Sequence, residues 1–266
     1  MASFDTRSRS SKRSSGAVES LRFLQQRRAG PLNLALRNQV EVMARTICIH
    51  GAGFSYGESG LWADRYIMSL VAKEQPTCLF LPHSTDDAIR YSEKFHRFWS
   101  PMGAKTKTLS LFTPDTPDIE SYILESDLIY VGGGNTKSML CLWREWGLDS
   151  SLRLAYDQGI IICGISAGAI CWFEEGYSDS IPGRNICLKG LGFLRGICNP
   201  HHEGQRAESF EAFCRDSDRT DLIGVPDSSL IIIRDDAISE IIVKEGVSMP
   251  LLGGCWSQGV PSVKIA

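Results

Sequence analysis

The stretch that most constrains this chain is residues 160–170, with the sequence Ile-Ile-Ile-Cys-Gly-Ile-Ser-Ala-Gly-Ala-Ile. Its first four residues form a short apolar run, which predicts a buried strand. Gly164 and Gly168 lack side chains where this strand and a following helix must nearly touch, so Ser166 can project from a sharp turn. The pattern predicts a nucleophile elbow. The competing interpretation is a tight turn whose serine only caps the helix.

Strand-like and helix-like segments alternate before this turn. Apolar β-branched runs predict strands, and helical spacing of apolar residues predicts helices between them. The predicted strands are 46–50, 77–81, 106–111 and 128–131, and the predicted helices are 62–73, 86–98 and 137–146. Residues 151–158 lead into the strand before Ser166. Such alternation predicts an α/β fold of three αβα layers around a mostly parallel sheet. Ligands of such sheets bind at the carboxyl ends of the strands, where the Ser166 turn and the glycine-rich residues 132–136 would both lie.

The pattern changes after Ser166. Residues 179–194 read as loop-rich, residues 204–215 as a helix, and residues 221–225 and 230–233 as strands. Residues 237–244 and 247–252 resemble a terminal hairpin that turns at Glu245 and Gly246. At 266 residues the chain is long enough for one large core, and we expect a single α/β domain over residues 46–266.

The N-terminal residues 1–45 differ in composition from the rest. They hold nine Lys and Arg side chains against three Asp and Glu, and serine is frequent near the start. We expect a disordered or processed extension. An organellar transit peptide and a true start at Met43 remain alternatives to a plain tail of a cytoplasmic protein.

Composition argues against several classes of protein. Residues 46–266 carry 19 basic and 28 acidic side chains, so the body lacks the basic surface of a nucleic-acid-binding protein. No apolar run approaches the length of a membrane span. The nine cysteines lack loop-framework or Cys-x-x-Cys spacing, which favours free thiols in a reducing compartment over disulfides or a zinc ribbon. Glycines 51 and 53 match a dinucleotide fingerprint poorly. We expect no metal and no cofactor.

A nucleophilic serine needs a base and a group that orients the base. Among five histidines, His201 lies in the sequence Asn-Pro-His-His-Glu, where Pro200 restricts the backbone. Asp227 lies at a turn between two predicted strands and is the candidate for the orienting acid. The chain order Ser, His, Asp differs from that of α/β-hydrolases, but triads are defined by geometry and not by order.

Three motifs together resemble the peptidase E family of serine peptidases. They are Gly-Gly-Gly-Asn-Thr at 132–136, Gly-Ile-Ser-Ala-Gly-Ala at 164–169 and Asn-Pro-His at 199–201. The family comprises α-aspartyl dipeptidases with cyanophycinases as relatives, on a fold similar to class I glutamine amidotransferases. The resemblance implies a small peptide substrate, and we expect a monomer or a homodimer.

The resemblance also implies roles for individual residues. Ser166 would be the nucleophile, His201 the general base and Asp227 the orienting acid. The backbone N–H groups of Gly133 and Ala167 would form the oxyanion hole. The residues implied to bind substrate are Gly134, Asn135 and Arg206, and the arginine would meet the carboxylate of a substrate whose first residue is aspartate.

Two other functions compete with a serine dipeptidase. One is a catalytically inactive amidotransferase-like domain that binds a ligand at the same sheet edge. The other is a glutaminase-type thiol enzyme that uses Cys163 or Cys171, although neither cysteine occupies the apex of the turn.

Overall fold

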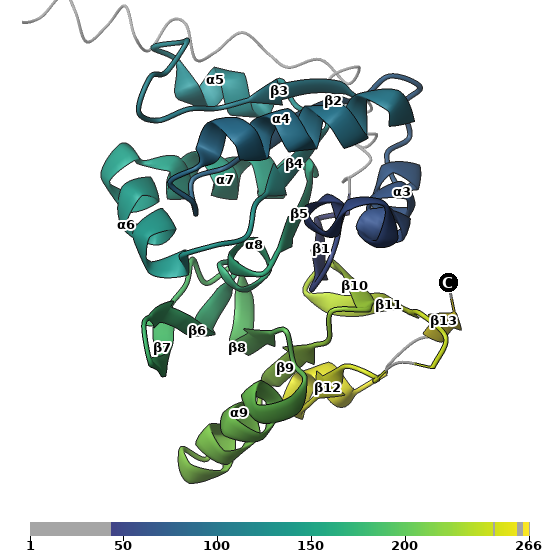
Figure 1. Cartoon of the computed structure of the whole chain (residues 1–266), viewed down its shortest axis with the longest axis vertical. Helices are drawn as coiled ribbons and strands as arrows, with labels where there is room; N and C mark the ends of the chain where they lie inside the picture. The colour runs from purple at the N-terminus through teal and green to yellow at the C-terminus, as the bar shows by residue number, and fades with distance from the viewer. Residues whose placement is uncertain (1–43, 247, 260–262, 266) are drawn as a thin grey trace, which may run out of the picture. The chain divides into compact units, whose positions relative to one another are not determined.

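The computed structural model describes residues 44–246, 248–259 and 263–265 (Figure 1). The predictions for residues 1–43, including a start at Met43, lie outside the described residues. Arg45, at the end of the predicted extension, contacts the folded body: its guanidinium lies 2.7 Å from the Asp236 carboxylate.

The main sheet has eight strands in the order β13-β11-β10-β1-β5-β4-β2-β3. The five strands from β1 to β3 in this order pair in parallel, whereas β10 pairs antiparallel with β1 and with β11. Their bounds are β1 Thr46–His50, β2 Thr77–Leu81, β3 Lys105–Thr108, β4 Leu128–Val131, β5 Ile161–Ile165, β10 Ser229–Arg234, β11 Ala237–Val243 and β13 Val263–Ile265. Strands β4 and β5 are direct neighbours, with Val131 opposite Gly164. The turns that follow these two strands therefore lie side by side.

Helices cover both faces of this sheet (Figure 1). Alternate residues of β1 show the two layers: Cys48 packs in one apolar cluster with the helix residue Phe95, and Ile47 packs in another with Met139. The first face is covered by α3 (Leu61–Ser69) and α4 (Ala88–Trp99), and the second by α5 (Ile119–Leu124), α6 (Thr136–Trp146), α7 (Leu148–Asp157) and α8 (Ala167–Ile170). The central strands are buried on both faces, as expected of a sheet between two helical layers.

A second, five-stranded sheet has the order β12-β9-β8-β6-β7. Its strands are β6 Phe173–Ile181, β7 Arg184–Lys189, β8 Leu194–Pro200, β9 Leu222–Val225 and β12 Leu251–Leu252, and α9 (Gly204–Asp216) packs on it through Phe210. The prediction that residues 179–194 are loop-rich is wrong, because β6 and β7 form an antiparallel hairpin there. The polar, partly exposed residues of this edge gave no apolar alternation to detect.

The predicted terminal hairpin is also wrong. Strand β11 pairs with β10 through a turn at Asp235 and Asp236, both with positive φ (47° and 66°), as a two-residue hairpin of type I′ requires. Strand β12 pairs instead with β9 in the second sheet. The Asp-Asp dipeptide is a weaker turn signal than Glu245-Gly246, so the sequence favoured the wrong partner. Val247 lies outside the described residues.

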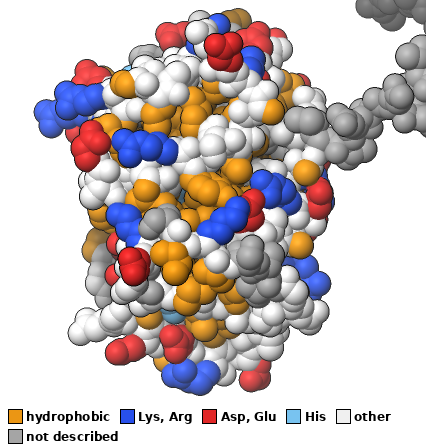
Figure 2. All heavy atoms as spheres, turned by 90° about the vertical axis from the view of Figure 1, so that its right-hand side faces the viewer, with side chains coloured by type: hydrophobic (Ala, Val, Ile, Leu, Met, Phe, Trp, Pro, Cys, Tyr) orange, Lys and Arg blue, Asp and Glu red, His pale blue; other side chains and the backbone are white. Residues whose placement is uncertain are grey.

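Charges are mixed on the face of the molecule that Figure 2 shows, where Lys and Arg side chains stand among Asp and Glu side chains. This face presents no continuous basic surface of the kind that phosphate binding needs. In the part of the chain that the structure describes, no helix combines the length and the apolar character needed to cross a membrane.

Candidate active site

Ser166 occupies a strained position between β5 and α8, with φ 56° and ψ −111°. The turn is closed by two contacts that only glycine permits. A Cβ atom on Gly164 would lie 2.2 Å from the carbonyl oxygen of Gly168, and one on Gly168 would lie 2.3 Å from that of Val131. The strand and the short helix therefore nearly touch, and the partly exposed Ser166 projects from the apex.

His201 reaches Ser166 from the end of β8. Its Nε2 lies 2.9 Å from Ser166 Oγ, so the ring can accept the hydroxyl proton. Pro200 ends the strand, and His201 itself has a φ of 52°, so the backbone turns sharply at the residue that bonds to Ser166. The structure thus brings together the two residues that the sequence predicted as nucleophile and base.

Asp227 completes a continuous chain of hydrogen bonds. Its Oδ1 lies 2.5 Å from His201 Nδ1, so the ring N–H donates to the carboxylate and Nε2 is left as an acceptor. A Cβ atom on Gly51 would lie 2.6 Å from the Asp227 Cα, so this glycine makes room for the acid. Tyr56 Oη donates to the second carboxylate oxygen at 3.3 Å, and Glu203 accepts the Asp227 backbone N–H at 3.1 Å.

The other histidines are engaged elsewhere. His50 is buried with Nε2 3.1 Å from Tyr130 Oη, and burial lowers the pKa of His50 to about 4. Trp143 donates to His83 Nδ1 at 2.8 Å, so His83 Nε2 donates to the Leu109 carbonyl, and burial lowers the pKa of His83 to about 4. His96 and His202 bond to other side chains. Of the five histidines, His201 is the one bonded to Ser166.

The glycine-rich turn after β4 lies against Ser166. A Cβ atom on Gly133 would lie 3.0 Å from Ser166 Cβ, so this glycine allows the close approach. The Gly133 N–H, which the resemblance implied as an oxyanion donor, already donates to Tyr91 Oη at 3.0 Å. The Ala167 N–H has no acceptor in the described residues, as expected of the first residue of a helix. Of the two implied donors, Ala167 is therefore the one that is free.

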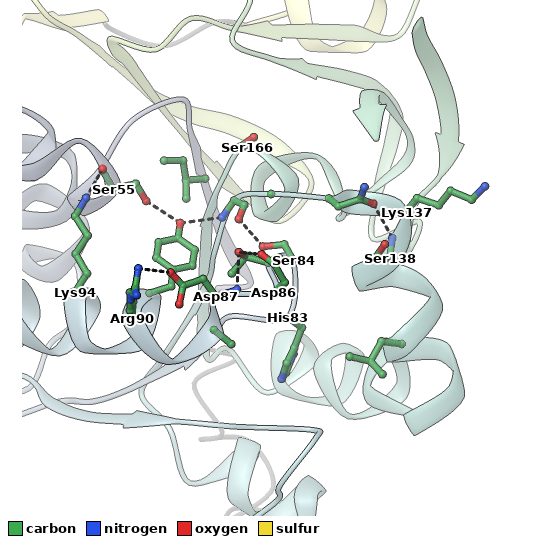
Figure 3. Close-up of a pocket in the computed structure, with 18 of the residues that line it drawn as sticks. Ser55, His83, Ser84, Asp86, Asp87, Arg90, Lys94, Lys137, Ser138 and Ser166 are labelled. Atoms are coloured by element: carbon green, nitrogen blue, oxygen red, sulfur yellow. Dashed lines mark hydrogen bonds and ion pairs between the residues drawn. The ribbon is translucent and has the colours of Figure 1, made fainter. Parts of the chain in front are cut away.

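A cavity of about 1560 Å³ opens beside Ser166 and His201 (Figure 3). Gly134 and Asn135, which the resemblance implies as substrate-binding residues, line this cavity. The Asn135 side chain also caps α6 by accepting the Ser138 N–H at 2.9 Å, and it donates to the Ser180 carbonyl at 3.0 Å. Its polar atoms therefore hold the turn and the second sheet in place. The cations that line the cavity, among the described residues, are Arg90, Lys94 and Lys137.

The implied role of Arg206 does not fit its position. Arg206 is absent from the cavity lining, and its guanidinium is occupied by protein acceptors. Its Nε donates to Asn199 Oδ1 at 2.9 Å and to the Pro200 carbonyl at 2.8 Å, and Nη2 donates to the Tyr177 carbonyl at 2.9 Å. Nη1 also lies 3.2 Å from Asp179. Arg206 therefore braces the turn that carries His201 and has no donor directed at a substrate in the cavity.

Thiol chemistry has no support in the geometry. Cys163 and Cys171 are fully buried, and burial raises both thiol pKa values well above their ordinary range, so neither is a thiolate at neutral pH. Cys141 is a free, exposed thiol that lines the cavity. It belongs to α6 and not to the turn that carries Ser166. Within the described residues no group of three or more metal-ligating side chains occurs.

Sequence reasoning missed three residues around the site: Ser84, Tyr56 and Tyr91. Ser84 lies in the turn that begins after β2 ends at Leu81, at the same edge of the sheet as Ser166, so its place after a parallel strand was a usable signal. Tyr56 and Tyr91 carried no such signal, because a tyrosine at helical spacing reads as a core residue.

The family model described as Peptidase family S51 matches residues 47–241. A Bacillus subtilis (strain 168) protein named uncharacterized peptidase YgaJ is 45% identical over 164 residues, covering 62% of this chain and 71% of that protein. A Drosophila melanogaster protein named "Probable alpha-aspartyl dipeptidase" is 30% identical over 121 residues, covering 45% of this chain and 47% of that protein.

The fold comparison agrees. A crystal structure of a peptidase from an acI-B1 Actinobacterium superimposes with a TM-score of 0.56 at 15% identity, covering 80% of this chain and 96% of that one. The predicted α/β fold, similar to class I glutamine amidotransferases, is confirmed. The sequence match covers most of the chain and includes Ser166 and His201. The chain therefore belongs to peptidase family S51.

Proposed function

We propose that this protein is a serine peptidase that hydrolyses short peptides, with Ser166, His201 and Asp227 as its catalytic triad. The observation that carries the proposal is the unbroken hydrogen-bond chain from Asp227 through His201 to Ser166, at 2.5 Å and 2.9 Å, beside an open cavity. A serine hydroxyl is a poor nucleophile unless a base accepts its proton, and this arrangement supplies both the base and the group that orients it.

The proposed reaction proceeds through an acyl-enzyme. Ser166 Oγ attacks the scissile carbonyl while His201 Nε2 takes the hydroxyl proton, and Asp227 stabilises the resulting imidazolium through Nδ1–H. The Ala167 N–H and an amide of the glycine turn hold the negative oxygen of the tetrahedral intermediate. His201 then protonates the leaving amine, the C–N bond breaks, and an ester to Ser166 remains. A water molecule, deprotonated by His201, hydrolyses that ester and restores Ser166.

We propose dipeptides with an N-terminal aspartate as the preferred substrates. The support is the resemblance in three motifs and the name of the fruit-fly relative. Because Arg206 lies outside the cavity lining, the cations that do line it, Arg90, Lys94 and Lys137, are the better candidates for meeting an acidic substrate group. The cavity exceeds the 300–1,000 Å³ range usual for small-ligand pockets, so longer peptides belong in any substrate test.

The experiment is a peptide panel assayed with the wild-type chain and with Ser166→Ala. The panel pairs Asp-Leu with isoaspartyl-Leu, Asn-Leu, Ala-Leu and Asp-Leu-Leu. Ser217→Ala, at the end of α9 and outside the cavity, is the matched control. We expect the wild type and the control to cleave Asp-Leu and Ser166→Ala to lose at least about 10³-fold in rate. Binding of Asp-Leu without cleavage by the wild type would instead favour an inactive ligand-binding domain.

A further inference from the structure

The glycine turn after β4 is held from two sides by side-chain hydroxyls. On one side, Tyr91 Oη accepts the Gly133 N–H at 3.0 Å. On the other side, Ser84 Oγ donates to the Gly133 carbonyl at 2.6 Å and lies 3.1 Å from the Gly132 carbonyl. In Figure 3, Ser84 lies next to the turn and below Ser166. Neither hydroxyl has a role in the proposed triad.

These two contacts fix which amide of the turn faces the nucleophile. Peptide bonds in the chain are trans, so the N–H of Gly134 points opposite to the carbonyl of Gly133. That carbonyl points to Ser84. The Gly134 N–H therefore points away from Ser84, and it has no acceptor in the described residues.

Ser166 lies on the side of the turn opposite to Ser84. The Cβ direction of Gly133 faces Ser166, whose Cβ would be 3.0 Å away, whereas that of Gly134 faces the Ser84 carbonyl at 2.2 Å. The glycine turn therefore lies between Ser84 and Ser166. Since the Gly134 N–H points away from Ser84 and lacks an acceptor among the described residues, it is the amide of the turn left available for an oxyanion formed at Ser166.

The Tyr91 ring is built into this position. A Cβ atom on Gly132 would lie 2.5 Å from Tyr91 Cε1, so the ring occupies the space that a side chain would need. The ring also packs against Phe54 and Phe80, with centroids 5.3 Å and 5.1 Å away. Burial raises the pKa of Tyr91, which keeps the hydroxyl neutral, and Ser55 Oγ lies 2.7 Å from it. The hydroxyl can therefore accept from Gly133 and donate to Ser55.

We propose that Tyr91 and Ser84 are positioning residues that preset the glycine turn, so that the N–H of Gly134, together with that of Ala167, binds the oxyanion. This inference rests on the proposed peptidase function. The inference gives Gly133 a structural role in the turn, because the Gly133 N–H already donates to Tyr91 Oη.

The test compares Tyr91→Phe and Ser84→Ala with two control variants. Each control removes the hydroxyl of the same residue type at a position away from the glycine turn. Tyr122→Phe removes a hydroxyl that donates to the Thr108 carbonyl, and Ser92→Ala removes one that donates within α4. For each variant, kcat and KM for Asp-Leu, the rate of Ser166 labelling by a fluorophosphonate, and the thermal midpoint are measured. The labelling rate matters because the phosphonyl oxygen enters the same oxyanion hole and does not depend on the peptide chosen.

We expect kcat and the labelling rate to fall by about 10- to 100-fold in Tyr91→Phe and Ser84→Ala, because oxyanion contacts act in the transition state. KM should stay within about twofold, and the controls should match the wild type. A residue with only a structural role would change the thermal midpoint and leave kcat of the folded protein intact, which would overturn the inference. Should Tyr91→Phe fail to fold, Ser84→Ala carries the same test.

Two further outcomes have distinct meanings. A rise of kcat in Tyr91→Phe would show that the tyrosine hydroxyl blocks the Gly133 N–H, and would overturn the assignment of Gly134. A wild type that neither cleaves any peptide nor labels at Ser166 would refute the proposed function, and the inference would fall with it. An active wild type with unaffected Tyr91→Phe and Ser84→Ala variants would refute the inference alone.

Discussion

Replacing Arg206 by alanine separates the two roles that sequence and structure assign to it. The resemblance implied a clamp for the substrate carboxylate, which predicts a loss confined to peptides that begin with aspartate. The structure places its guanidinium beneath the turn that carries His201. We therefore expect Arg206→Ala to lower stability and to reduce the hydrolysis of every peptide by a similar factor.

The size of the stability loss follows from the contacts. Nε shares one N–H between Asn199 Oδ1 and the Pro200 carbonyl, and Nη2 donates to the Tyr177 carbonyl, all three acceptors belonging to buried residues. Two hydrogen bonds from a charged donor contribute about 3 kcal/mol together. The ion pair with Asp179, whose side chain is 73% exposed, adds little. For a domain of this size we expect the thermal midpoint to fall by about 9 °C.

The assay is thermal unfolding combined with the dipeptide panel. Arg215→Ala, an exposed arginine at the end of the same helix, is the control and should behave as the wild type. An unchanged midpoint in Arg206→Ala together with a loss restricted to Asp-first peptides would refute this reasoning and restore the carboxylate clamp.

Three further predictions concern the core around the site. Cys163→Ala and Cys171→Ala should keep Ser166 reactive towards a fluorophosphonate, and loss of labelling in a folded variant would point to thiol chemistry. Gly164→Ala places a Cβ atom 2.2 Å from the Gly168 carbonyl oxygen. We therefore expect the free energy of unfolding, measured with urea, to fall by more than about 3 kcal/mol. A urea midpoint equal to that of the wild type would contradict this close packing. Burial raises the pKa of Asp64 from 3.8 to about 7, so the stability it contributes below pH 4 should disappear as the pH rises through 7. Asp64→Asn should abolish this pH dependence of the free energy of unfolding, which amounts to at most about 4 kcal/mol between pH 4 and 8. The same pH dependence in Asp64→Asn as in the wild type would exclude a raised pKa of Asp64.

Much of the α/β core was predictable because its signals are local. The strand before Ser166 is apolar, and Gly164 and Gly168 mark the contact that the turn requires. Parallel strands separated by helices then place their carboxyl ends at one edge, which brings the turn at 132–136 next to Ser166. These inferences need only periodicity and the rules of α/β connection.

The second sheet was not predictable in the same way. Strands β6 and β7 alternate weakly and stabilise one another through pairing at a sheet edge, which no local pattern reveals. Strand β12 has two residues and exists because β9 lies beside it. Pairing between distant segments decides both cases.

The proposed triad and the residues that support it differ in the same respect. Ser166 and His201 lie in motifs that constrain their backbones, so each could be singled out from the sequence. The contact of Tyr91 with Gly133 joins residues 42 positions apart through an ordinary helix, and no spacing rule foretells it. The role of Arg206 stays a prediction, because in a sequence an arginine near His201 reads alike whether its acceptors are a ligand or the protein.

The most direct test of the account is active-site labelling of the full chain at pH 7.5 with a fluorophosphonate, followed by intact mass and peptide mapping. We predict one adduct per chain, located on Ser166, absent in Ser166→Ala and slowed at least about 10³-fold in His201→Ala. No adduct on the wild type, or an equal adduct on Ser166→Ala, would contradict the claim that Ser166 is an activated nucleophile.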